Sequence, residues 1–223
     1  MLYRQCFVFV LSIFLLLGLG GCSQQMMDEI NRMISAKFGG YTKSDPLRVY
    51  VSPFKPHDKW SESEIGKIAW QGAVDGVKDI AFFSDNKIVF VGPKTSGYFG
   101  VDEKAYTNAL ETDNFWTSRG GSVRKKVRKL AERRNANSVI YGIYDGDDSG
   151  LKLTVHLYAK TDDVILKERQ EIKARFRVVK SLIEGKQRKR TLTTAEEALQ
   201  KKIHEKVKVS TARLLTKYME GRN

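Results

Sequence analysis

The side chains best placed to hold a metal ion lie in the run Asp145-Gly-Asp147-Asp148-Ser149-Gly150. Carboxylates at alternate positions ahead of a glycine are typical of loops that wrap calcium, a hard cation that prefers oxygen ligands. Such a loop also needs a bidentate glutamate at its twelfth position, where this chain has His156. Alternating apolar residues flank the run on both sides, so the pattern favours a turn between two strands, and we expect no metal here.

The three histidines, His57, His156 and His204, show no spacing typical of a metal site. His156 alternates with the apolar Val155 and Leu157, so we expect it on the opposite, solvated face of a strand. The sequence contains no Walker phosphate loop, no His-Glu-x-x-His zinc pair and no nucleophile elbow. These observations favour a protein that is not an enzyme and has no cofactor. An enzyme assembled from distant carboxylates remains a third hypothesis.

One cysteine stands where a covalent modification is expected. Leu19-Gly20-Gly21-Cys22 follows the apolar run from Phe7 to Leu17, which itself follows a basic start at Arg4. The alternative is a transmembrane helix, but that needs roughly 20 apolar residues and this run is shorter. The pattern resembles a bacterial lipoprotein signal over residues 1–21. The resemblance implies cleavage before Cys22, a diacylglycerol on its sulfur and an acyl chain on its amine.

The same resemblance implies a location. In many lipoprotein families an aspartate after the lipidated cysteine retains the protein in the inner membrane, whereas this chain has Ser23. We therefore expect the outer membrane, on its periplasmic side. Cys6 falls inside the signal and Cys22 would be acylated, so no disulfide is expected. About 200 remaining residues can fold on hydrophobic packing without one.

The net charge of +13 is unevenly distributed. Residues 151–223 carry 19 Lys and Arg against 9 Asp and Glu, while the two earlier portions are nearly balanced. In an exported protein this excess points away from nucleic acid and toward lipid phosphates, peptidoglycan carboxylates or acidic proteins. For a single run such as Arg124-Lys125-Lys126, a solvated helix face is the simpler interpretation.

Residues 22–46 are predicted to form a lipid-proximal amphipathic helix followed by a tether. Met26, Ile30, Met33 and Phe38 recur at helical spacing, and Gly39-Gly40 ends the pattern. The apolar side of this helix fits the headgroup layer, its own domain or a partner.

A domain with an α/β (α+β) fold is predicted over residues 47–172, in the order strand, helix, strand, helix, then three strands. The strands are 47–51, 87–91, 138–144, 151–158 and 164–167, and the last three form an antiparallel meander. Ser61 with Glu64 predicts a capping box for the first helix, in which Gly72 and Gly76 suggest close packing on a sheet. Ser122 is predicted to begin the second helix. We expect a small mixed sheet with helices on one face.

Residues 173–223 form a basic, helical C-terminal extension. Alternation from Ile172 to Val178 fits a strand, but the same residues also fit a helix, and both alternatives stay open. Thr194 with Glu197 predicts a capping box for a long helix ending near Met219. We expect its apolar side to pack on its own sheet, with a subunit contact as the alternative.

The element order and several motifs resemble a domain shared by envelope proteins. Arg48-Val-Tyr-Val-Ser-Pro-Phe54, Leu130 to Gly142, and Thr161-Asp-Asp163 carry the likeness. The domain occurs in the curli-secretion lipoprotein, the outer-membrane lipoprotein activators of penicillin-binding proteins, some flagellar outer-membrane lipoproteins and the N-terminal part of TolB. The resemblance covers residues 47–172. It implies a protein-binding or assembly module. Residues 93–121 and the basic extension depart from the pattern.

We therefore expect a lipid-anchored module that binds an envelope protein such as a peptidoglycan synthase. A subunit of an oligomeric ring or secretion channel is the alternative. A channel needs lipid-facing strands of about ten alternating residues, and residues 93–121 show no such alternation. Candidate contact residues are the aromatics Tyr98, Phe99 and Trp116. Candidate steering cations toward peptidoglycan or an acidic partner are Arg188, Lys189 and Arg190.

Overall fold

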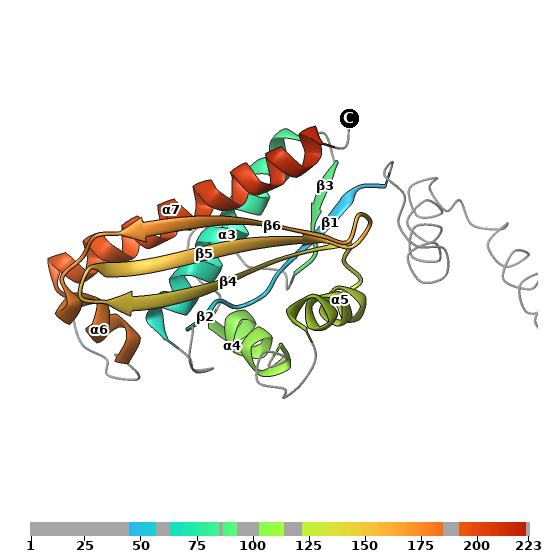
Figure 1. Ribbon diagram of the computed structural model, residues 1–223. Coiled ribbons are helices and arrows are strands. Elements are labelled where there is room, and N and C mark those ends of the chain that lie inside the picture. The colour runs from blue at the N-terminus through green and yellow to red at the C-terminus, as the bar shows by residue number, and fades with distance from the viewer. Residues whose placement is uncertain are drawn as a thin grey trace, which may run out of the picture. The chain divides into compact units, whose positions relative to one another are not determined.

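The computed structural model describes residues 45–56, 63–84, 87–92, 103–113, 122–184 and 192–221. They fold into a mixed sheet of six strands with five helices (Figure 1). The strands are β1 (Leu47–Val51), β2 (Lys55–Pro56), β3 (Ile88–Phe90), β4 (Ser138–Asp147), β5 (Gly150–Ala159) and β6 (Val164–Ile172). The helices are α3 (Glu64–Phe83), α4 (Glu103–Thr112), α5 (Val123–Arg133), α6 (Phe176–Glu184) and α7 (Thr194–Glu220).

The sheet has the strand order β3-β1-β4-β5-β6, and the short β2 pairs with β4. β1 lies parallel to both β3 and β4, while β4, β5 and β6 form an antiparallel meander. The predicted α/β class, the mixed sheet, the meander and the order of the main elements are therefore confirmed. The hairpin turns at residues 148–149, so the predicted turn 145–150 is too long: 145–147 belong to β4, and Gly150, the first residue of β5, adopts a φ of 133° that a side chain would strain.

Helices lie on both faces of the sheet, so the expectation of helices on one face is wrong. On the first face, called the α7 face, the alternating residues of β1 and β5 pack against α3, α6 and α7. On the second, called the α5 face, Tyr50, Val139 and Tyr158 pack against Val127 and Leu130 of α5. Figure 1 shows β4, β5 and β6 passing in front of α3 and α7, with α5 on the other side of the sheet. Tyr50 of β1 and Val139 and Tyr141 of β4 are apolar or aromatic at outward positions because they belong to the cluster that α5 covers.

Two of the three predicted helix starts are shifted. α3 is capped by Ser63, whose hydroxyl accepts from the Gly66 amide at 3.0 Å, so Ser61 is not the cap. α7 begins with the capping box of Thr193 and Glu196, one residue before the predicted pair. The Ser122 cap of α5 is confirmed. The ambiguous segment after Ile172 is a helix, because β6 ends at Ile172, residues 173–175 form no strand and α6 begins at Phe176.

α3 and α7 cross at very short range, and glycines make this possible. A Cβ atom on Gly72 would lie 2.5 Å from the His204 carbonyl oxygen, and one on Gly76 would lie 2.6 Å from the Lys208 carbonyl oxygen. The two glycines therefore serve contact with a helix, and the expected packing on a sheet is corrected. His204 also meets Asp75 at 2.8 Å and Lys208 meets Asp79 at 2.7 Å, so polar pairs flank the contact.

Another glycine explains two of the sequence motifs together. Phe54, which follows β1, is fully buried with its ring over Gly142 of β4. A Cβ on Gly142 would lie 2.0 Å from a ring carbon of Phe54. The aromatic residue after the first strand and the glycine in the fourth therefore depend on each other.

The α3–α7 crossing predicts that a glycine-to-alanine substitution within a helix will destabilise the protein. Replacing a helical glycine with alanine ordinarily stabilises a helix by about 1 kcal/mol. Gly72→Ala should instead lower the free energy of unfolding by about 2 kcal/mol, because its methyl group meets backbone that cannot rotate away. Gly221→Ala is the matched control, since a Cβ there has only ordinary contacts at 3.6 Å and beyond. Urea unfolding of both variants measures this, and a Gly72→Ala protein as stable as the parent would contradict the crossing.

Candidate interaction surfaces

The residues proposed from the sequence for lipidation and partner contact lie outside the described part of the chain. They are Cys22, Tyr98, Phe99, Trp116, Arg188, Lys189 and Arg190. The described residues add features that the sequence did not single out: a buried polar cluster, a stacked histidine and a basic helix, all on the α5 face.

The buried cluster consists of Tyr50 on β1, Asp113 just after α4, and Arg134 just after α5. The Tyr50 hydroxyl donates to Asp113 Oδ2 at 2.6 Å, and Arg134 Nη2 donates to Asp113 Oδ1 at 2.7 Å. The Arg134 guanidinium also lies 4.9 Å from the centre of the Tyr50 ring. Burial, and then the charge of Asp113, raises the pKa of Tyr50 well above its ordinary value. The cluster joins the ends of α4 and α5 to the middle of the sheet.

This cluster has a structural role. A buried carboxylate is costly unless it is paired and hydrogen-bonded, and Asp113 has both kinds of partner. No single motif signals it, because its members come from positions 50, 113 and 134. The aromatic residue in the outward position of β1 was the available hint.

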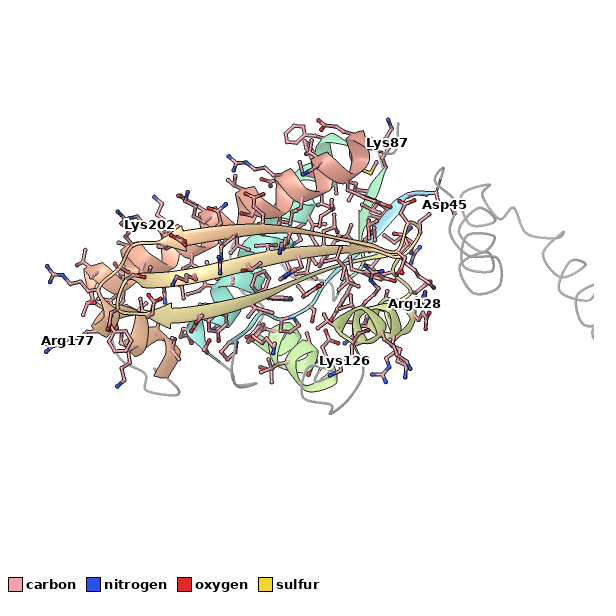
Figure 2. All side chains as sticks on the ribbon, viewed as in Figure 1. Asp45, Lys87, Lys126, Arg128, Arg177 and Lys202 are labelled. Carbon is pink, nitrogen blue, oxygen red and sulfur yellow. The ribbon has the colours of Figure 1, made fainter. Side chains whose placement is uncertain are left out.

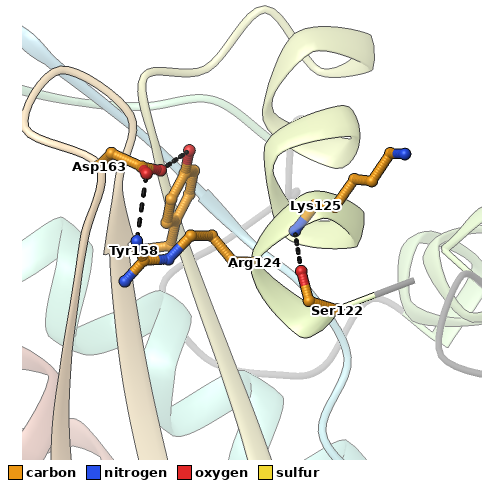
Figure 3. A network of polar contacts seen from close by, with 5 residues as sticks. All are labelled: Ser122, Arg124, Lys125, Tyr158 and Asp163. Carbon is orange, nitrogen blue, oxygen red and sulfur yellow. Dashed lines mark hydrogen bonds and ion pairs between the residues drawn. The ribbon is translucent and has the colours of Figure 1, made fainter.

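A second network holds the start of α5 against the β5–β6 turn (Figure 3). Ser122 accepts from the Lys125 amide at 3.3 Å, and Arg124 pairs with Asp163 at 3.2 Å. The Tyr158 hydroxyl donates to the other oxygen of Asp163 at 3.1 Å. Asp163 has a φ of 50°, a conformation that Asp and Asn adopt more readily than most residues. Asp163 therefore suits the backbone conformation of this turn and also forms the ion pair with Arg124.

His156 is half-buried, so its predicted solvated position is wrong. Its ring stacks on Tyr141, the residue directly opposite on β4, with ring centres 4.7 Å apart and an interplanar angle of 5°. The residue opposite His156 on β6 is Lys167. Burial, and secondly the charge of Lys167, lowers the pKa of His156 to about 4. The imidazole is therefore neutral near pH 7.

Beyond His156 the α5 face becomes polar. Thr154 lies opposite Ile143 on β4 and Arg169 on β6, and both Lys167 and Arg169 are exposed. Farther along the same face Asp145 and Glu171 are exposed, and Lys152 of β5 lies between them. Figure 1 shows no labelled helix in front of this part of β5 and β6.

α5 extends the positive region. Its one carboxylate is Glu132, and its exposed cations are Arg124, Lys125, Arg128, Lys129 and Arg133. The apolar Val127, Leu130 and Ala131 occupy the side that packs on the sheet, which leaves the cations on the other sides. Figure 2 shows Arg128 and Lys126 around this helix. Together, α5 with Lys167 and Arg169 forms a surface suited to an anionic protein or polymer. We call it the basic α5 surface.

The described residues contain no helix that is both long and apolar enough to cross a bilayer. Within the same residues, no three His, Cys, Asp or Glu side chains are grouped so that they could hold a metal ion. In the hairpin, Asp147 instead pairs with Lys152 at 2.5 Å and accepts from the Ser149 amide at 2.9 Å. These hydrogen bonds, first that of Lys152, lower the pKa of Asp147 well below its ordinary value.

Comparison with known proteins reveals little similarity to this chain. No protein-family model matches the sequence, and no curated protein matches it. TolB from Acinetobacter baumannii is a structural neighbour with a TM-score of 0.29 and 8% sequence identity. The match covers 58% of this chain and 24% of TolB. The α/β class of the described residues comes from their own helices and strands, and their similarity to TolB is weak.

The depressed pKa of His156 predicts how stability depends on pH. Unfolded histidine has a pKa near 6.5 and takes up a proton between pH 7 and 5, whereas folded His156 stays neutral until about pH 4. Acidification therefore favours the unfolded chain, and this group should remove about 1 to 2 kcal/mol of stability between pH 7 and 5. His156→Phe keeps an aromatic ring on Tyr141 and should lose less stability over that interval.

Urea unfolding at pH 7 and pH 5 measures the effect in parent and variant. His204→Gln is the control, because it removes the histidine paired with Asp75 and leaves His156 in place. That variant should keep the pH dependence attributed to His156. Parallel losses in the parent and His156→Phe would show that the ring is solvated after all.

Proposed function

We propose that this protein is a lipid-anchored periplasmic protein of the outer membrane that acts as a non-catalytic protein-binding or envelope-assembly module. The observation that carries the anchor is Leu19-Gly20-Gly21-Cys22 after a short apolar run with a basic start. Cleavage there makes Cys22 the first residue, and two or more acyl chains give stable membrane attachment. Ser23 supports the outer membrane as its destination.

The binding role is supported by the basic α5 surface. Its helix is fixed at both ends, by Arg124 with Asp163 at the start and by Arg134 with Asp113 at the end. Exposed cations on such a fixed element are held in position without the partner, so binding needs less ordering of the surface. Exposed cations also speed association with an anionic partner. We infer that the partner is an envelope protein with an acidic surface. Peptidoglycan is the polymer whose negative charge would also complement this basic surface.

The anchor is tested first by substituting its acylated residue. Cys22→Ser removes the thiol that would receive the diacylglycerol, so incorporation of a fatty-acid analogue should fall to background. The precursor should also escape cleavage by the lipoprotein peptidase. Metabolic labelling followed by gel fluorescence measures both results, and Cys6→Ser is the matched control because it lies within the predicted signal. Equal labelling of Cys22→Ser and parent would refute the lipoprotein hypothesis.

The binding surface is tested by reversing its charge. The triple variant Lys129→Glu, Lys167→Glu and Arg169→Glu should lower partner capture in cells at least tenfold, because attraction becomes repulsion. Crosslinking in intact cells with mass spectrometry identifies the captured proteins. The control changes three exposed lysines of α7 by the same net charge: Lys201→Glu, Lys202→Glu and Lys206→Glu.

Both variants should melt like the parent, since all six residues are exposed. Equal loss of capture in the two variants would mean that net charge matters and the α5 surface does not. Crosslinks mainly between copies of this chain would instead favour the oligomeric ring. The roles of Tyr98, Phe99, Trp116 and the cations 188–190 stay predictions, tested in the same assay by alanine substitution.

A further inference from the structure

α3 ends in two aromatic side chains that the domain does not bury. Phe82 is 76% exposed and Phe83 is 78% exposed, whereas the other exposed large apolar residues in the described part of the chain lie between 36% and 45%. The two rings contact each other edge to face, with centres 5.1 Å apart. Two adjacent phenylalanine side chains with this exposure are unusual, because most phenylalanine in folded proteins is buried. Exposed apolar groups of this kind often mark a site of interaction.

The position of this pair connects it to the entrance of the domain. Ser84 follows Phe83, and its carbonyl accepts from the Lys87 amide at 2.9 Å. The Lys87 carbonyl in turn accepts from the Leu47 amide at 2.7 Å, at the first residue of β1. The chain that arrives from Cys22 therefore enters the fold beside the end of α3. Figure 2 shows Lys87 and Asp45 toward the same end of the sheet, with Arg177 at the opposite end.

We propose that Phe82 and Phe83 rest in the headgroup layer of the bilayer that holds the lipid anchor, as a second membrane contact. This inference rests on the anchor at Cys22 proposed above. The path from Cys22 to Asp45 is 23 residues, at most about 80 Å when fully extended, and it attaches at this end of the domain. The two rings therefore lie at the end of the domain to which the path from the anchor attaches.

The charges around the pair suit a lipid surface. Lys87 is exposed, and Lys78 lies 5.9 Å from the centre of the Phe90 ring, one turn before the pair on α3. The carboxylate of Asp79 is paired with Lys208 at 2.7 Å, which offsets its repulsion from phosphate. Aromatic side chains with nearby lysines are the usual composition of surfaces that lie at a bilayer interface, where the rings insert and the cations meet anionic headgroups.

The experiment places a fluorescent label at Phe83→Cys in the lipidated protein and reconstitutes it in vesicles containing 30% phosphatidylglycerol. Lipids with a nitroxide quencher near the headgroup should quench this label several-fold more than a label at Phe176→Cys. Phe176 is the matched control, since it is an apolar residue 40% exposed at the start of α6, in the part of the sheet where Arg177 lies. Replacing Phe82 with Ser should reduce the quenching at position 83.

The same label separates this inference from the anchor itself. In a second preparation a hexahistidine tag replaces Cys22 and nickel-chelating lipid supplies the attachment, so the result does not depend on natural acylation. Strong quenching at position 83 there supports the contact even if Cys22 proves unlipidated. Equal quenching at positions 83 and 176 in both preparations would overturn it. A label that is shielded from water without quenching would overturn it too, and would assign the pair to the predicted helix of residues 24–38 or to a second copy of the chain.

Discussion

The close approach of two helix backbones at Gly72 and Gly76 sets the position of everything on the α7 face. Without side chains at these positions, α7 comes near enough to α3 for the two helices to close this face together, α3 over β1, β3 and β4 and α7 over β5 and β6. Ile203, Val207 and Leu215 then enter a single apolar core with the inward residues of β1 and β5. Polar pairs at Asp75 and Asp79 fix the rotation of α7 about its axis, because only one register brings His204 and Lys208 opposite them.

The two faces of the sheet are closed by different means, and this difference bears on function. The α7 face is sealed by long helices and a large apolar core, whereas α5 is held on the other face by a smaller apolar cluster and by the buried polar groups around Asp113. A partly covered sheet face keeps exposed cross-strand side chains beside a rigid basic helix. Such a surface requires little rearrangement to meet a partner, which is consistent with a binding module.

Periodicity predicted the class of fold and most elements, because alternation in 47–51 and 151–157 reflects real burial on one face. Cap positions were missed where the sequence offers two equivalent registers. Thr193-Thr194 with Glu196-Glu197 fits a capping box twice, and Ser181, which donates to Glu196 from α6, favours the earlier one. Likewise the Ser63 hydroxyl hydrogen-bonds the Tyr144 hydroxyl of β4, a contact that no local pattern contains.

The prediction for His156 was wrong because the ring is covered by Tyr141, which lies on the other strand of the hairpin. The buried cluster of Tyr50, Asp113 and Arg134 could not be predicted for the same reason, because its members are far apart in the sequence.

α7 follows every other described helix and strand of this fold in sequence, and this has a consequence for the order of folding. Synthesis proceeds from the N-terminus, so the apolar side of α3 and the inward residues of β5 appear long before Leu199 to Tyr218 can cover them. β1 must also wait for β4, which pairs with it some 90 residues later. Contacts between residues so far apart in the sequence make folding slow, and incomplete chains with exposed apolar surface are prone to aggregate. Loss of even the last turns of α7 would then produce a substrate for chaperones and proteases rather than a smaller domain.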